Sequence, residues 1–336
     1  MKWRSFWAVL FALAVGCGDS QGTTGGNGGS GAANGTGGSG ATTGTGGSGA
    51  ATGTGGGGGT FIPPAGSYTM KWGPTEVPSG VESTQCVVKR LGNPGGTFIH
   101  QIHNVLGATS HHFIVYKVND TVEQLEPQPC QPFLDVLGDP PLIITQKADD
   151  LLTLPPGVAY QLEPNQMIRL ELHYVNVTAA PQMAEANSTF IPMPAEEVTD
   201  EADVMFMGDI GIFIPAQSTA TVGPTFIQVP EEFHGVNYFA ITGHEHQWGT
   251  NVYVETTAGS GMPGTPVYDV FNFRWDEPET VKHDPPFTIS DGGGFNLTCD
   301  WNNLSNSPVT FGTGVDDEMC FFWAYYYPSR GPLVLF

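Results

Sequence analysis

The chain has 336 residues and a formal net charge of −22 at neutral pH, with 33 acidic residues against 11 lysines and arginines. So few cations cannot neutralise a run of phosphates, which argues against nucleic acid as a partner. There is also no P-loop and no G-x-S-x-G motif, so these classes of nucleotide-binding protein and hydrolase are excluded.

Residues 1–16 are predicted to be a lipoprotein signal peptide. Lys2 and Arg4 give a positive start, and the apolar run that follows is too short to span a bilayer. Small residues precede Cys17, as in bacterial lipoproteins. We therefore expect export, with lipid on Cys17 tethering the protein to a membrane or surface of a bacterial cell envelope. The alternative is ordinary cleavage that leaves an unmodified cysteine.

Residues 17–62 are predicted to be a flexible linker. From Gly18 to Gly59 the chain consists chiefly of Gly, Ser, Thr, Ala and Asn, with no apolar side chain larger than Ala to seed a core. This disordered stretch should hold a folded body away from the membrane.

The remaining residues predict an all-β fold. Short segments rich in Val, Ile, Phe and Tyr alternate in polarity and are separated by Pro and Gly, which is typical of strands and turns. The expected strands are 97–102, 111–118, 167–177, 209–216, 237–244 and 250–256. We expect two antiparallel, jelly-roll-like β-sandwich domains packed side by side, 63–188 and 189–336, because the alternation is lost over 176–188.

Four cysteines remain once Cys17 is set aside. In an exported chain they predict two disulfides, one in each half, which could form in three connectivities. The pairs Cys86–Cys130 and Cys299–Cys320 close the shortest loops, and each could stabilise the fold by about 3–4 kcal/mol. Paired cysteines cannot be metal ligands.

Histidine pairs are the candidate ligands. His244 and His246 lie two apart in an expected strand, so both should point to one face. His111 and His112 are adjacent, so they can share a metal only through a local bulge or different ring nitrogens. His173 lies in a third expected strand. The alternative for each is an ordinary surface or hydrogen-bonded core histidine.

Met319 adds a ligand of a different kind near the C-terminus. A thioether is a soft ligand suited to Cu(I), and imidazoles suit copper in both oxidation states. The sequence thus offers one set of three histidines in the first half and one set of two histidines and a methionine in the second.

Four stretches, "SHHFIVYK", "LELHYVN", "GHEHQWG" and "DEMCFFWAYYYP", resemble the copper type II, ascorbate-dependent monooxygenases in their order and comparable spacing. The resemblance covers roughly residues 66–336. It implies a fold of two β-sandwiches with one copper on each, and both of the disulfide pairings given above.

The resemblance also implies the roles of the ligands. His111, His112 and His173 match the electron-transfer copper site, and His244, His246 and Met319 match the copper site where oxygen binds and hydroxylation occurs. The implied reaction uses O2 and an external reductant such as ascorbate to hydroxylate an activated C–H of a small-molecule substrate.

The chain departs from the peptide-amidating members at three positions. Where these hold the substrate carboxylate with arginine, asparagine and tyrosine, this chain has Thr242, Phe321 and Trp323. None can pair a carboxylate bidentately, so an apolar or aromatic substrate is expected at this predicted pocket. The alternative is that Phe321 and Trp323 are core residues.

Two other functions are compatible with the sequence. One is a non-catalytic copper-binding lipoprotein that scavenges or delivers copper. The other is a cell-surface adhesion or scaffold module that binds no stoichiometric copper.

Overall fold

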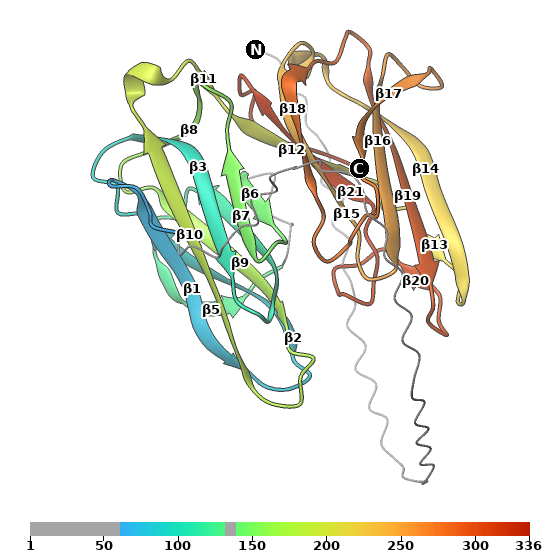
Figure 1. The fold of residues 1–336 in the computed structure, drawn as a ribbon, viewed down its shortest axis with the longest axis horizontal. Coiled ribbons are helices and arrows are strands. Elements are labelled where there is room, and N and C mark those ends of the chain that lie inside the picture. Colours follow the sequence, from blue (N-terminus) through green and yellow to red (C-terminus); the bar gives the residue numbers. More distant parts are fainter. Residues whose placement is uncertain (1–60, 132–138) are drawn as a thin grey trace, which may run out of the picture. The chain divides into compact units, whose positions relative to one another are not determined.

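A computed structural model describes residues 61–131 and 139–336 (Figure 1). The predicted signal peptide, Cys17 and nearly all of the predicted linker lie outside the described residues. Within these ranges the chain is all-β, with strands numbered β1 to β22, two 3-10 turns, η1 (Ala195–Glu197) and η2 (Glu231–Phe233), and no α-helix. None of the described segments forms a helix with the length and apolar character needed to cross a membrane.

The first half of the described chain forms two sheets (Figure 1). One has the order β1 (Tyr68–Val77), β10 (Gln182–Met193), β3 (Thr97–Leu106), β8 (Val158–Leu162), β11 (Asp200–Glu201), with β7 (Asp149–Thr153) also paired to β3. The other has the order β5 (Gln124–Pro129), β2 (Glu82–Arg90), β9 (Met167–Val175), β4 (Ser110–Val118), β6 (Pro141–Thr145).

The second half contributes three sheets. The first has the order β18 (Thr280–Phe287), β15 (Asn237–His244), β21 (Phe321–Tyr327), β12 (Asp203–Gly208), β22 (Leu333–Leu335). The second has the order β14 (Ser218–Gln228), β19 (Gly294–Asn303), β16 (Gly249–Thr257), β17 (Gly264–Asp269). A short pair joins β13 (Phe213–Ile214) to β20 (Val309–Thr310). All strand pairs are antiparallel except β8 with β11 and β12 with β22.

Five of the six predicted strands are observed over most of their expected length, as β3, β4, β9, β15 and β16. The exception is 209–216, where only Phe213–Ile214 is a strand. The Asp209 carboxylate accepts a hydrogen bond from the backbone N–H of Gly211 at 2.7 Å. This local turn competes with extended pairing, so alternation alone overestimated the strand.

The expected boundary between residues 188 and 189 falls inside β10. This strand pairs along its length with β1 and β3 of the first half. Its inward positions Ala184, Ala186 and Ser188 are buried but small, so the alternation is present without the large apolar residues that reveal a strand in sequence. Residues 189–193 therefore pair with first-half strands, contrary to the expected boundary.

Strand β21 faces two different apolar layers. Successive side chains of a strand point to opposite faces, and here Phe321, Trp323 and Tyr325 belong to a cluster shared with both first-half sheets. Phe322 and Tyr326 belong to a second cluster formed by residues of the second half. Both faces of β21 are therefore buried.

Both expected disulfides are present. Cys86–Cys130 joins β2 to the residue that follows β5, and Cys299–Cys320 joins β19 to the residue that precedes β21. The second pair fixes the backbone directly after Met319.

Asp203 makes the free energy of unfolding depend on pH. Its carboxylate accepts hydrogen bonds from the backbone N–H of Val204 and the hydroxyl of Ser329, each at 2.9 Å. Burial is the main cause that raises the pKa of Asp203 to about 6. The folded state therefore favours the protonated carboxyl group. Its contribution to the free energy of unfolding is fully present below the unfolded pKa of about 4, and it is lost as pH rises through the folded pKa of about 6.

We predict that Asp203→Asn becomes more stable relative to the parent chain as pH rises from 4 to 7, by at most about 3 kcal/mol. Denaturant unfolding at both pH values measures this difference. A difference in unfolding free energy that stays constant with pH would contradict the prediction.

Candidate metal centres

His111, His112 and His173 come together on two neighbouring strands, β4 and β9. His112 is the direct cross-strand partner of His173. The register shifts between Ser110 and His112, so His111 occupies an irregularity of the kind that the adjacent pair requires. Of the two alternatives, a local bulge or different ring nitrogens, the register shift corresponds to the first.

The three rings form a compact donor set. Their centroids lie 5.7 Å apart for His111 and His112, 5.3 Å for His111 and His173, and 4.7 Å for His112 and His173. One nitrogen from each ring lies within 4.8 Å of the others. Donors to one ion at about 2 Å are at most about 4 Å apart, so small ring adjustments suffice. Buried His111 Nε2 has no hydrogen-bond partner among the described residues, which also fits a metal ligand.

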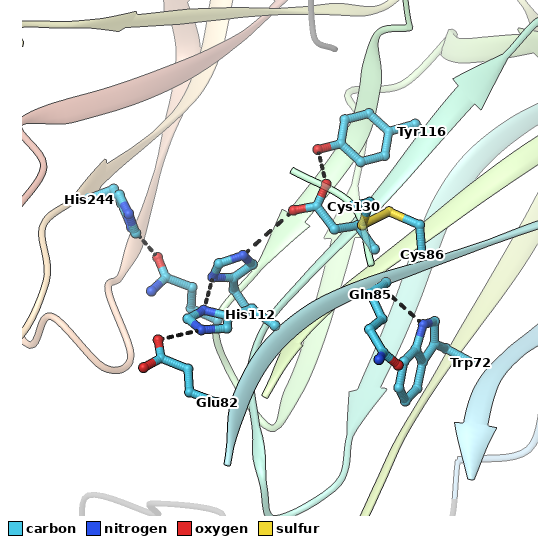
Figure 2. A network of polar contacts seen from close by, with 11 residues as sticks. Trp72, Glu82, Gln85, Cys86, His112, Tyr116, Cys130 and His244 are labelled. Carbon is cyan, nitrogen blue, oxygen red and sulfur yellow. Dashed lines mark hydrogen bonds and ion pairs between the residues drawn. A yellow bond between two sulfur atoms is a disulfide. The ribbon is translucent and has the colours of Figure 1, made fainter. Parts of the chain in front are cut away.

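Carboxylates contact the outer nitrogens of two of these rings (Figure 2). The Nδ1 atoms of His112 and His173 lie 3.4 Å apart, whereas His173 Nε2 lies 2.8 Å from Glu82 and His112 Nε2 lies 3.7 Å from Glu171. The Tyr116 hydroxyl donates to Glu171 at 2.8 Å. Such outer partners orient metal-binding histidines, so the arrangement leaves the Nδ1 atoms as the inward donors of His112 and His173.

Burial disfavours the charged forms of His111 and His112. It lowers the pKa of His111 to about 3 and that of His112 well below its usual value, and the neighbouring histidines act in the same direction. Burial also raises the pKa of Glu171 to about 8. At neutral pH the contact between His112 and Glu171 therefore joins neutral groups rather than forming a salt bridge, and neutral imidazole is the metal-binding form.

His244 and His246 also face each other, but not on one regular strand. Strand β15 ends at His244, and His246 lies in the turn that follows. The rings are 5.2 Å apart at their centroids and nearly perpendicular. The expectation of two ligands on one strand is thus wrong in its local geometry, although the two side chains do converge. Burial lowers the pKa of His246 to about 4 and that of His244 well below its usual value.

Two glycines allow the turn to pack closely against its neighbours. A Cβ on Gly243 would lie 2.7 Å from both Tyr268 and Val252, and one on Gly249 would lie 2.4 Å from the Cβ of Glu245. Glu245, the residue between the histidines, is fully buried against Gly249. The sequence "GHEHQWG" therefore places the smallest residues where the turn packs most closely.

Met319 lies two residues before the start of β21 and is 3% exposed. Phe321, the first residue of β21, is the cross-strand partner of His244. The backbone N–H groups of Met319 and His246 both donate to one oxygen of Glu318, at 3.3 and 2.9 Å. The backbone of Met319 thus lies beside the turn that carries the histidine pair.

Glu318 is a buried acceptor at the centre of these segments. Besides the two N–H groups above, it accepts from the backbone N–H of Trp248 at 2.8 Å and from the indole N–H of Trp301 at 2.9 Å. Burial raises the pKa of Glu318 to about 7, and these donors act against the rise.

Two first-half side chains contact segments that carry the second ligand set. Gln146 Oε1 lies 2.9 Å from His244 Nδ1 (Figure 2), and its amide donates to the Trp275 carbonyl at 3.3 Å. The oxygen of Glu82 that contacts His173 also accepts from the backbone N–H of Val315 at 3.1 Å. With Nδ1 of His244 held by Gln146, its Nε2 is the nitrogen placed for a metal.

The predicted substrate positions are buried side chains beside His244. Thr242, Phe321 and Trp323 are each at most 3% exposed. The Thr242 hydroxyl is hydrogen-bonded to that of Thr280 at 2.8 Å, and Phe206 stacks on Phe321 with centroids 5.1 Å apart. The Trp323 ring lies 6.1 Å from that of His244. All three therefore pack in the core, as the alternative interpretation of the aromatic pair expected.

One family model matches part of the chain. Residues 200–333 match the family described as copper type II ascorbate-dependent monooxygenase, C-terminal domain. The predicted resemblance is confirmed over these residues. The matched monooxygenase domain contains His244, His246, Met319 and the Cys299–Cys320 disulfide, whereas the three-histidine set lies outside it.

Other comparisons are weak. The major capsid protein P2 from bacteriophage PM2 is 8% identical, with a TM-score of 0.33, covering 79% of this chain and 99% of that chain. PNGase F, a glycosylasparaginase from Flavobacterium meningosepticum, is 10% identical, with a TM-score of 0.31, covering 80% of this chain and 97% of that chain. No curated protein matches the chain.

Sequence reasoning missed the groups that surround the ligands. Glu171 could have been found, since it lies two residues before His173 on the same strand and so shares its face. Glu318 directly precedes Met319, but nothing in the pattern marks it as buried. Glu82 and Gln146 reach their histidines from distant segments and leave no local signal.

We predict that Gly249→Ala weakens copper binding at the His244–His246 pair by at least about tenfold, because the added Cβ displaces Glu245 and shifts the turn. Competition titration with a Cu(I) chelator measures the affinity of each site, and that of the three-histidine set should not change. Gly95→Ala is the matched control, since a Cβ there meets nothing within 4 Å. Unchanged affinity at both sites in Gly249→Ala would show that the turn does not define the second site.

Proposed function

We propose that the protein is a copper-dependent monooxygenase that hydroxylates an activated C–H of a small apolar or aromatic substrate, using O2 and an external reductant such as ascorbate. The match of residues 200–333 to the monooxygenase domain carries this proposal. It is supported independently by the three-histidine set, because that set assembles outside the matched residues.

Two donor sets would hold two coppers. His111, His112 and His173 would hold the electron-transfer copper, and His244, His246 and Met319 the one at which oxygen is used. When bound, copper supplies the one-electron chemistry that O2 activation requires, and neutral imidazoles with a thioether suit its reduced state.

The chain's own residues would fix and shield these donors. Glu82 and Gln146 hold ring nitrogens of His173 and His244, which orients the opposite nitrogens inward. His244, His246 and Met319 are each at most 3% exposed. Surrounding protein therefore limits the access of bulk water to this set.

The proposed substrate class rests on the three positions at which this chain differs from the peptide-amidating members, because none of them carries a cation. Thr242, Phe321 and Trp323 lie beside His244 or directly across from it, and none can pair a carboxylate bidentately. An apolar or aromatic substrate, rather than a peptidylglycine, therefore suits a site built next to these core residues.

We also propose that the two halves are two β-sandwiches joined after β10. Apart from the two-residue strand β11, which pairs with β8, the strands before and after this point form separate sheets. Residues from both first-half sheets share one apolar cluster. Such an arrangement would place one ligand set on each sandwich.

Oxygen uptake by the copper-loaded protein with ascorbate tests the function. We expect uptake coupled to product formation with phenethylamines or apolar aromatic compounds, and little with peptidylglycines. Stoichiometric copper without substrate-coupled uptake would instead indicate a copper-scavenging or copper-delivery lipoprotein.

We predict that Met319→Ile keeps the fold and the first copper but lowers hydroxylation more than about tenfold. The apolar swap costs less than about 1.5 kcal/mol in packing, whereas loss of the thioether removes a copper ligand. Product formation per minute at saturating substrate gives the effect. Met207→Ile, a buried methionine of the other cluster, is the control. Equal turnover in the two variants would show that Met319 is a core residue only.

We further propose that lipid on Cys17 anchors the protein and that residues 18–59 act only as a tether. Cys17→Ser should release the protein from membranes, and a chain starting at Phe61 should form both disulfides and bind copper as the full chain does. Membrane fractionation and metal analysis measure these outcomes. Loss of copper from the shortened chain would give the Gly-rich stretch a role in the site.

A further inference from the structure

Glu318 joins three segments that are far apart in the sequence. One carboxylate oxygen, Oε2, accepts from the backbone N–H of His246, the backbone N–H of Met319 and the indole N–H of Trp301. The other, Oε1, accepts from the backbone N–H of Trp248. The side chain therefore ties the turn after β15 to strand β19 and to the residue that precedes Cys320.

The position of Glu318 is itself fixed by backbone contacts. Its N–H donates to the Thr310 carbonyl at 3.0 Å, and its carbonyl accepts from the Gly312 N–H at 3.2 Å. Glu318 is 0% exposed and Trp301 is 1% exposed. Loss of the carboxylate would therefore leave buried N–H donors without their present acceptor, which is costly.

Two of the backbone donors share one carboxylate oxygen. His246 and Met319 are separated by 73 positions, yet their backbones meet at the same atom, Oε2 of Glu318. A disulfide holds Met319 from its other side, through Cys320. The turn that carries His246 has no such covalent link. It is joined to the Met319 segment by the pairing of His244 with Phe321, by the contact of His246 Nδ1 with the Asp317 carbonyl at 3.1 Å, and by the Glu318 carboxylate. Of these contacts, the carboxylate alone accepts from the backbone N–H groups of both His246 and Met319.

We propose that Glu318 is a positioning residue for the second copper: its carboxylate sets the spacing between the backbones of His246 and Met319. This inference rests on the proposed function, since it takes both residues as ligands. Glu318 does not itself bind the metal, because its oxygens face backbone and indole donors.

Glu318→Gln tests the proposal because it keeps the size of the side chain. It replaces one acceptor oxygen with an NH2 group, which would face N–H donors instead of accepting from them. We expect the second copper to bind about 10- to 100-fold more weakly and the first copper to keep its affinity. We also expect X-ray absorption of the Cu(I) form to lose the copper–sulfur scattering of Met319.

Asp203→Asn is the matched control, since Asp203 is a partly buried, hydrogen-bonded carboxylate at the opposite end of the β12–β21 pair from Phe321. It should keep both coppers and the sulfur signal. The same sulfur signal and second-site affinity in Glu318→Gln as in the parent chain would overturn the proposal. A parent chain that shows no copper–sulfur scattering would instead contradict the proposed ligand set.

Trp301→Phe provides a milder test if Glu318→Gln does not fold. It removes one donor and leaves the carboxylate in place, so the second copper should bind about 2- to 10-fold more weakly. Unchanged second-site affinity in this folded variant, measured by the same chelator competition, would also overturn the proposal.

Discussion

Strand β21 packs against an apolar cluster on each of its two faces. This packing fixes the register of the strand, and therefore the position of Met319, which lies two residues before the strand. Its alternate residues enter different clusters, with Phe321 and Trp323 on one side and Phe322 and Tyr326 on the other. Fully burying one such side chain contributes about 1.5–3 kcal/mol. Shifting the register of β21 by one residue would move each of these side chains to the wrong face of the sheet. The same alternation assigns Met319 to the first cluster and Cys320 to the second.

Both ligand sets are held by elements that do not require a metal for their shape. In the first set, an irregularity in β4 turns His111 toward its neighbours, and carboxylates hold the outer nitrogens of His112 and His173. In the second, the Glu318 carboxylate and the Cys299–Cys320 disulfide hold the backbone on either side of Met319. If Met319 binds copper as proposed, the fold rather than the strength of the copper–sulfur bond would keep this thioether in place.

The all-β class, five of the 22 strands of the described residues, both disulfides and the convergence of the histidines could be predicted from sequence. The histidine patterns were informative because strand geometry converts spacing into direction. Prediction failed where local polar contacts or small side chains override the pattern. Asp209 shortens an expected strand by bonding to Gly211, and small buried residues such as Ala184 and Ala186 conceal β10. Gln146 and Glu82 contact histidines through tertiary packing, which no local pattern encodes.

The central claim is that one chain carries two unequal copper sites. Anaerobic titration of the purified protein with Cu(I) tests it most directly, by counting the coppers bound and comparing the parent chain with His111→Ala and His246→Ala. The account predicts two coppers in the parent chain and one in each variant, with sulfur scattering lost only in His246→Ala. A single copper in the parent chain, or loss of both coppers from either variant, would contradict two independently assembled sites.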